Sequence, residues 1–148
     1  RMGRRTFQLL QFHFHAPSEH TLFGQRFDME LHLVHKDEWG NLGVLGALIK
    51  KGDRNPALQT VWDNIPKGSG SERKGPKFNA ASLLPADLSY FRYSGSLTTP
   101  PCSEGVSWYV LKNPITASDD QILRFTKLYD NNSRPLQKRN DRALIATP

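Results

Sequence analysis

Hydrophobic and polar residues alternate along two stretches of the chain, residues 6–15 and about 26–36, with the period of two that is typical of β-strands. Successive side chains of a strand point to opposite faces. One face of the first predicted strand therefore carries Gln11, His13 and His15. In the second strand, one face carries Glu30, His32 and Val34, and the other carries Phe27, Met29, Leu31 and Leu33. If the two strands are neighbours, their polar faces bring three histidines together.

Further along, the pattern predicts both strands and helices. Residues 37–41 predict a hairpin connection, and the continuous apolar run at 42–50 favours a buried strand. Residues 56–65 have apolar positions at helical spacing, with Asn55 suited to the N-cap and Pro56 to the first helical turn. Pro66 ends this predicted helix, and the Gly, Ser and charged residues at 67–77 predict an exposed loop.

The second half continues with short elements. A helical turn is predicted at 80–84, an aromatic strand at 90–93 and another strand at 106–112. Ser118 is a suitable N-cap for a second helix, whose apolar stripe comprises Ile122, Leu123, Phe125 and Leu128. We find no internal repeat and no sign of a second domain. The pattern therefore predicts one domain over residues 1–148, made mostly of short strands with two helices at the periphery.

Composition narrows the possible partners. The 148 residues contain no apolar run near the roughly 20 residues that a membrane span requires. The formal charge of +6 could suggest nucleic acid, but the basic residues are scattered, with short clusters only at 1–5, 73–77 and 138–142. We therefore expect neither a nucleic-acid nor a membrane partner. The chain starts with Arg1, so we expect the natural N-terminus to lie upstream, and the lack of a signal peptide does not indicate location.

The histidines are the candidate metal ligands. Three imidazoles converging from a rigid sheet suit a catalytic zinc site with an open fourth position. A lone His-x-His pair is weak evidence, and ordinary strand histidines are the alternative. The pattern is stronger here because Gln11 precedes His13, and Glu30 precedes His32, by two residues on the same face. Amides and carboxylates commonly accept the N–H on the ring nitrogen of a metal-bound imidazole that does not bind the metal.

Other reactive side chains have simpler interpretations. His35 is predicted on the opposite face, as a structural residue, and His20 as a hydrogen-bonded packing residue in a turn. Glu19 lies between the two predicted strands, where a buried acceptor is plausible. Cys102, the only cysteine, could be a free thiol or half of a disulfide with a partner outside this chain. As a fourth ligand it would close the site, which we disfavour because three histidines already suffice.

Five motifs carry a family resemblance: FHFHAPSEHT, ELHLVH, LGVLGALIKKG, YSGSLTTPPCSEGVSWYVL and NNSRPLQ. In order and spacing, over essentially the whole chain, they resemble the α-class carbonic anhydrases, most closely the bacterial, secreted branch. The resemblance implies the α-carbonic anhydrase fold, which is mainly β, with a central, mostly antiparallel twisted sheet and a few peripheral helices. It also implies a zinc lyase (carbonate dehydratase) activity and a periplasmic or secreted location. The expected reaction is the reversible hydration of carbon dioxide to bicarbonate and a proton by a zinc-bound hydroxide.

The resemblance further implies roles for individual residues. Zn²⁺ would be bound by His13, His15 and His32. The groups behind these ligands would be Gln11 for His13, Glu30 for His32 and the backbone near Asn132 for His15, with His20 and Tyr93 in a buried hydrogen-bond network. The Thr98 hydroxyl would donate to Glu19, so that its lone pair must accept from the hydroxide. The apolar wall that receives CO₂ would comprise Val34, Val44, Leu97, Val106 and Trp108, with Thr99 at its cavity side.

The chain also departs from the family pattern. The family's domain is longer at its N-terminus, and we expect about the first third of it to be absent here. That part normally carries the proton-shuttle histidine, part of the cavity wall and the cysteine that would pair with Cys102. Two rival functions therefore stay open: a zinc-binding but catalytically impaired fragment, and a carbonic-anhydrase-like interaction domain. A homodimer also stays open.

Overall fold

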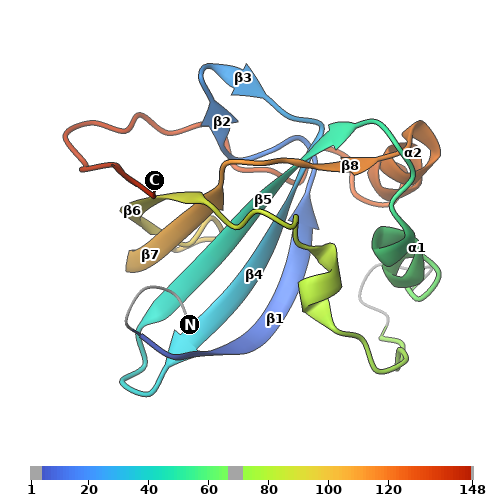
Figure 1. Ribbon diagram of the computed structural model, residues 1–148, viewed down its shortest axis with the longest axis horizontal. Helices are drawn as coiled ribbons and strands as arrows, with labels where there is room; N and C mark the ends of the chain where they lie inside the picture. The colour runs from blue at the N-terminus through green and yellow to red at the C-terminus, as the bar shows by residue number, and fades with distance from the viewer. Residues whose placement is uncertain (1–4, 67–71, 148) are drawn as a thin grey trace.

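The computed structural model describes residues 5–66 and 72–147 and is built on one seven-stranded mixed sheet (Figure 1). Six strands lie in the spatial order β1, β4, β5, β7, β6 and β9, and β8 lies beside β5. Their bounds are Phe7–His15 (β1), Met29–Asp37 (β4), Leu42–Lys51 (β5), Tyr90–Ser96 (β6), Glu104–Leu111 (β7), Ile115–Ala117 (β8) and Ile145–Ala146 (β9). All pairs are antiparallel except β5 with β7 and β5 with β8, which are parallel. The predicted fold class is thus confirmed.

The second predicted strand starts later than the sequence suggested. A small hairpin, β2 (Thr21–Leu22) and β3 (Gln25–Arg26), precedes β4, which begins at Met29. Phe27 lies between them because Ser18 binds its backbone, accepting from the Phe27 N–H through Oγ at 3.0 Å and donating to its carbonyl at 3.1 Å. Phe27 packs with the cluster around Val34 and not with that of Met29. Placing Phe27 on the face of Met29 was therefore wrong.

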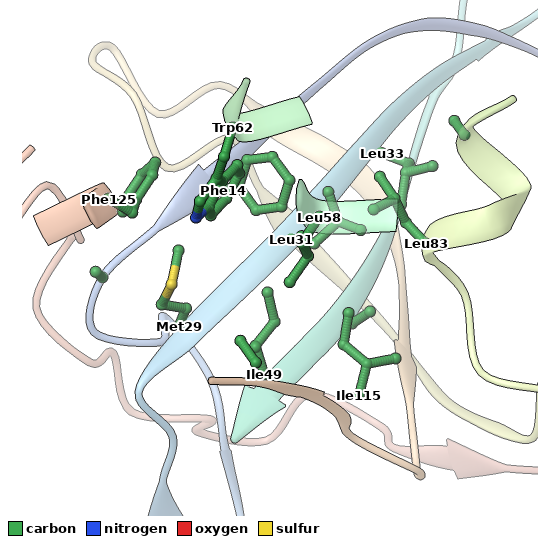
Figure 2. Packing of buried hydrophobic residues seen from close by; sticks show 14 of the residues in the cluster. Phe14, Met29, Leu31, Leu33, Ile49, Leu58, Trp62, Leu83, Ile115 and Phe125 are labelled. Carbon is green, nitrogen blue, oxygen red and sulfur yellow. The ribbon is translucent and has the colours of Figure 1, made fainter. Parts of the chain in front are cut away.

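One face of the sheet is covered by the helical elements (Figure 1). These are α1 (Pro56–Trp62), the 3₁₀-helix η1 (Ala80–Leu83) and α2 (Asp119–Thr126). The core under them joins apolar side chains of β1, β4 and β5 to Leu58 and Trp62 of α1 and Phe125 of α2 (Figure 2). The rings of Trp62 and Phe125 stack with centroids 5.5 Å apart. Burial of this apolar surface is the main force that holds the helices on the sheet.

The helices differ from their predictions in detail. Asn55 and Ser118 cap α1 and α2 as predicted, but α1 ends at Trp62, with Asp63 as its C-cap, so the helix does not reach Ile65. In α2, Leu123 is 54% exposed, and Leu128 beyond the helix is 43% exposed. Both line a groove of about 480 Å³ between α1 and α2, so they are not part of the buried stripe.

The remaining predictions concern shorter segments. β6 is longer than the predicted aromatic strand, and β8 and β9 were not predicted because strands of two or three residues carry almost no pattern. The basic cluster at 1–5 and the loop at 67–77 lie partly outside the described residues. No helix in the described ranges is long and apolar enough to cross a membrane.

The opposite face of the sheet holds a second, smaller apolar cluster. Its buried members come from β4, β5 and β7 and are Val34, Val44, Leu48, Val106, Trp108 and Val110. The polar side chains of β1 and the start of β4 occupy the same face beside it, because side chains alternate along each strand. The candidate site therefore lies on the face without helices.

Candidate metal centre

Three histidines from two adjacent strands converge as predicted. His13 and His15 lie on β1, and His32 on β4, directly opposite His13 in the antiparallel register. One ring nitrogen from each lies within 4.8 Å of the others. Ring centroids are 4.9 Å apart for His13 and His15, 5.3 Å for His13 and His32, and 4.6 Å for His15 and His32. Cys102, a free cysteine, is not part of this cluster.

Each ring is held by a hydrogen bond through one nitrogen. His13 Nδ1 lies 2.8 Å from Gln11 Oε1, and His15 Nδ1 lies 3.0 Å from the Asn132 carbonyl oxygen. His32 Nε2 lies 2.9 Å from Glu30 Oε1. Since a carbonyl or carboxylate oxygen accepts, these contacts assign the N–H to the bonded nitrogen of each ring. His13 Nε2, His15 Nε2 and His32 Nδ1 are left with lone pairs.

These free nitrogens fit a metal ion. His15 Nε2 is buried and has no hydrogen-bond partner, an arrangement that costs about 1–3 kcal/mol unless another group satisfies it. Burial, followed by repulsion from His32 and His15, lowers the pKa of His13 to about 4. Burial and His32 likewise lower the pKa of His15, although its bond to Asn132 acts in the opposite direction. Both rings are therefore neutral at pH 7, the form that binds metals.

Glu30 is the centre of a buried polar network. Its Oε1 accepts from His32 and lies 2.6 Å from His20 Nδ1, while Oε2 accepts the backbone N–H groups of Glu19 and His20 at 2.9 Å. Burial raises the pKa of Glu30, but the charges and hydrogen bonds of His20 and His32 outweigh burial and hold it well below its usual range. His20 Nε2 in turn lies 2.6 Å from the Tyr93 hydroxyl. The predicted network of His20 and Tyr93 is thus present.

His20, Glu30 and His32 also lie close enough together to hold a metal ion. However, Glu30 Oε1 is already hydrogen-bonded to His20 Nδ1 and His32 Nε2, so these three atoms are not free to bind a metal ion. Burial lowers the pKa of His20, but the Glu30 charge and hydrogen bond more than compensate and raise it. We therefore interpret this group as a hydrogen-bond network that orients His32.

Glu19 is buried next to the histidines, but its partner differs from the expected one. Its side chain is 3% exposed, and Oε1 accepts the Arg134 backbone N–H at 2.6 Å. Oε2 has no hydrogen-bond partner, so the bond expected from the Thr98 hydroxyl is not formed in this structure. Thr98 belongs to a turn that is closed by other bonds, from the Leu97 N–H to Ser103 and from the Cys102 N–H to Thr99.

The residues predicted to form the apolar wall lie together. Val34, Val44, Val106 and Trp108 are all buried in the second apolar cluster, and Leu97 packs against it. Thr99, predicted at the cavity side, is exposed. The cluster is continuous with the histidines, since the His32 and Trp108 rings have centroids 4.8 Å apart.

Two residues beside the site escaped the sequence analysis. Gly46 lies opposite His32 in the register of β4 and β5, and a Cβ there would lie 2.9 Å from Glu30 Oε1. A glycine inside an apolar strand is a sign of such close approach, so this residue could have been found. Arg134, whose N–H binds Glu19, had no local signal, because its partner is 115 residues away in sequence.

Fold and donors together define a mixed β-sheet protein with a candidate three-histidine metal centre. Comparison with known families makes the assignment specific. The model of the eukaryotic-type carbonic anhydrase family matches residues 1–147, and the chain belongs to this family, the α-class carbonic anhydrases.

Individual relatives agree with this assignment. The carbonic anhydrase of Nostoc sp. is 48% identical over 145 residues, which are 97% of this chain and 55% of the relative. Dioscorin dioA3 of Dioscorea japonica is 38% identical over 153 residues, covering 97% of this chain and 56% of the relative. The chain thus spans a little more than half the length of these relatives. The α-carbonic anhydrase of Thermovibrio ammonificans, solved with the inhibitor sulfanilamide, has 46% sequence identity and a TM-score of 0.92 over 96% of this chain and 64% of its own.

Proposed function

We propose that the chain binds one Zn²⁺ ion and catalyses the reversible hydration of CO₂ to bicarbonate and a proton. The observation that carries this proposal is the set of three free imidazole nitrogens, on His13, His15 and His32, one of which is buried without a partner. Three histidines with an open fourth position are the donor set of a catalytic zinc site. Membership of the carbonic anhydrase family supports this reaction over other uses of zinc.

When bound, zinc supplies a Lewis acid that acidifies a coordinated water, a property for which carbonic anhydrase is itself the standard example. The chain's own groups prepare the ligands. Gln11, Glu30 and the Asn132 carbonyl each accept the single N–H of one imidazole, which fixes its tautomer and increases its basicity.

Glu19 and Thr98 would orient the nucleophile. Glu19 Oε2 is buried and has no partner, so it can accept one further O–H. If the Thr98 hydroxyl donates its only proton to this oxygen, the hydroxyl oxygen has only lone pairs left. It would therefore accept the O–H of the reacting water. This role requires a hydrogen bond between Thr98 and Glu19 that is not formed in the present structure.

The apolar cluster would receive the substrate. CO₂ is small and carries no net charge, so it is suited to an apolar wall, which binds water poorly. This wall would be formed by Val34, Val44, Val106 and Trp108. Leu97, which packs against this cluster, would complete the wall, with Thr99 beside it.

The proposal can be tested with two histidine variants. His32→Ala removes a ligand, whereas His35→Ala removes a ring of β4 that donates to the Leu33 carbonyl at 2.8 Å and is not in the cluster. We expect His32→Ala to lose tight zinc binding and CO₂ hydration, measured by chelator competition and stopped-flow assay, and His35→Ala to keep both. Equal zinc retention by the two variants would refute the ligand assignment.

The same measurements separate the rival functions. Tight zinc binding without CO₂ hydration, in both the original chain and His35→Ala, would indicate a catalytically impaired zinc-binding chain. Absence of tight zinc binding in the original chain would leave an interaction domain as the better interpretation.

A further inference from the structure

The side chain of Asn132 makes contacts that the ligand assignment does not use. Its Oδ1 accepts the Ala16 backbone N–H at 2.9 Å, and its Nδ2 donates to the Phe14 carbonyl at 3.0 Å. Its own backbone carbonyl accepts from His15 Nδ1 at 3.0 Å. One residue thus holds the backbone on both sides of His15 as well as the His15 ring.

The two backbone contacts imitate the pairing of a neighbouring strand. Phe14 and Ala16 are two positions apart, so their backbone groups point to the same edge of the chain. Among the described residues, β1 pairs only with β4 and forms the edge of the sheet. In these contacts the Asn132 amide uses one N–H donor and its carbonyl acceptor, as a peptide group of an adjacent strand would. It therefore stabilises the end of β1 where no adjacent strand does so.

Asn132 is itself held in place by the residues that follow it. Ser133 Oγ accepts from Arg26 Nη2 at 3.2 Å, and Arg26 Nε donates to the Ser18 carbonyl at 3.0 Å. The Arg134 N–H donates to Glu19. These contacts attach the segment after Asn132 to the turn that follows β1. The Asn132 carbonyl and the end of β1, which carries His15, therefore belong to one hydrogen-bonded unit.

We infer that the Asn132 side-chain amide is a positioning group for His15: by binding the backbone of Phe14 and Ala16, it determines where His15 Nε2 lies relative to the other two ligands. This inference rests on the proposed zinc-binding role of His15. It goes beyond the role of the Asn132 carbonyl, since a substitution of the side chain leaves that carbonyl in the chain but removes the contacts that fix its place.

The test compares Asn132→Ala with Asn131→Gly in the full chain. Asn131 has a φ of 50°, a conformation that glycine adopts freely, so its replacement alters the same segment without removing the amide of Asn132. We expect Asn132→Ala to weaken zinc binding about 10- to 100-fold by chelator competition, as removal of a group behind a metal ligand usually does. We expect Asn131→Gly to stay within about twofold of the original chain.

Two readouts report position rather than general stability. The visible spectrum of the Co²⁺-loaded protein depends on ligand number and geometry, and we expect Asn132→Ala to change it while Asn131→Gly does not. In the metal-free protein, the Ala16 amide should exchange with solvent faster in Asn132→Ala, because its acceptor is gone. Unchanged zinc affinity and an unchanged cobalt spectrum in folded Asn132→Ala would overturn the inference.

A milder variant covers the case in which Asn132→Ala does not fold. Asn132→Asp keeps the acceptor for Ala16 but replaces the donor to Phe14 with a carboxylate oxygen, so the cobalt spectrum should still change, and an identical spectrum would overturn the inference.

His15→Ala separates this result from failure of the proposed function. If His15→Ala binds zinc as tightly as the original chain, the ligand assignment is wrong, whereas its loss of binding leaves the Asn132 comparison valid.

Discussion

At the scale of single residues, the proton on each imidazole decides whether the candidate centre can bind a metal. The three acceptors, Gln11, Glu30 and the Asn132 carbonyl, assign that proton to the hydrogen-bonded nitrogen and leave the other nitrogen of each ring with a lone pair. Alternation along two strands was sufficient to predict Gln11 and Glu30, which precede their histidines by two residues. Alternation could not predict the contact between His15 and the Asn132 carbonyl, because 117 residues separate the two. Only the family resemblance indicated this contact.

Gly46→Ala should weaken zinc binding without touching a ligand. The new Cβ would lie 2.9 Å from Glu30 Oε1, the atom that orients His32, so the carboxylate must move. We expect zinc affinity to fall about 10-fold or more, as for other groups behind metal ligands, measured by chelator competition.

Gly52→Ala is the matched control for this prediction. It introduces a similar clash, 2.9 Å from Thr116 Cγ2, just beyond the end of β5. Both variants should lose stability, but only Gly46→Ala should lose zinc affinity. Equal zinc affinity in the two variants would show that the position of Glu30 does not control His32.

The metal-free protein should lose stability as the pH falls from about 6.5 to about 4, in part because of His13. Its pKa is lowered from 6.5 to about 4 in the folded state, so in this window the unfolded chain binds a proton that the folded chain does not. Proton uptake therefore favours unfolding, and above pH 6.5 the effect disappears. Urea unfolding at several pH values should show a smaller pH dependence in His13→Asn, and an unchanged dependence would contradict the lowered pKa.

At the scale of elements, the helices show what local sequence determines. Ser118 caps α2 as predicted, and the structure adds Gln121 as the reciprocal partner of a capping box, which depends only on residues three apart. The burial of Gln121 could not be predicted, since it follows from the neighbouring α1. Its Oε1 accepts the Asn55 N–H and its Nε2 donates to the Asn55 carbonyl, both across 66 residues of sequence. The start of β4 at Met29 was also not predicted from local pattern, because it follows from the hydrogen bond between the Phe27 N–H and Ser18 Oγ.

Gln121→Leu should destabilise the helical layer and spare the metal centre. It keeps an apolar contact but leaves the N–H and carbonyl of Asn55 without their partner, which should lower the free energy of unfolding by about 1–3 kcal/mol. Chemical denaturation measures this change, and zinc affinity should not move, because α2 lies on the opposite face of the sheet. The exposed substitution Thr60→Ala in α1 is the control, and similar stability in both variants would contradict the assigned role of Gln121.

At the scale of the whole molecule, two of the three histidines lie on an edge strand. Within the described residues β1 pairs only with β4, so the rigidity of His13 and His15 depends on that one ladder and on contacts such as Asn132. Sequence alternation predicted which side chains share a face of each strand, but not which strands are neighbours. The parallel pairing of β5 with β7, which joins residues about 60 positions apart, had no signal in the local pattern. The chain spans 55% of the Nostoc relative, so hydration of CO₂ by this chain is the claim that most needs a direct test.

The most direct test is stopped-flow CO₂ hydration while zinc is titrated into the metal-free 148-residue chain in concentrated imidazole buffer. The imidazole carries protons between the site and bulk solvent, so the assay isolates the chemistry of the centre. We predict that catalysed hydration rises in proportion to added zinc, stops at one equivalent per chain and disappears on chelation. A chain that binds one equivalent of zinc tightly, yet hydrates CO₂ no faster than the buffer alone, would contradict the proposed function.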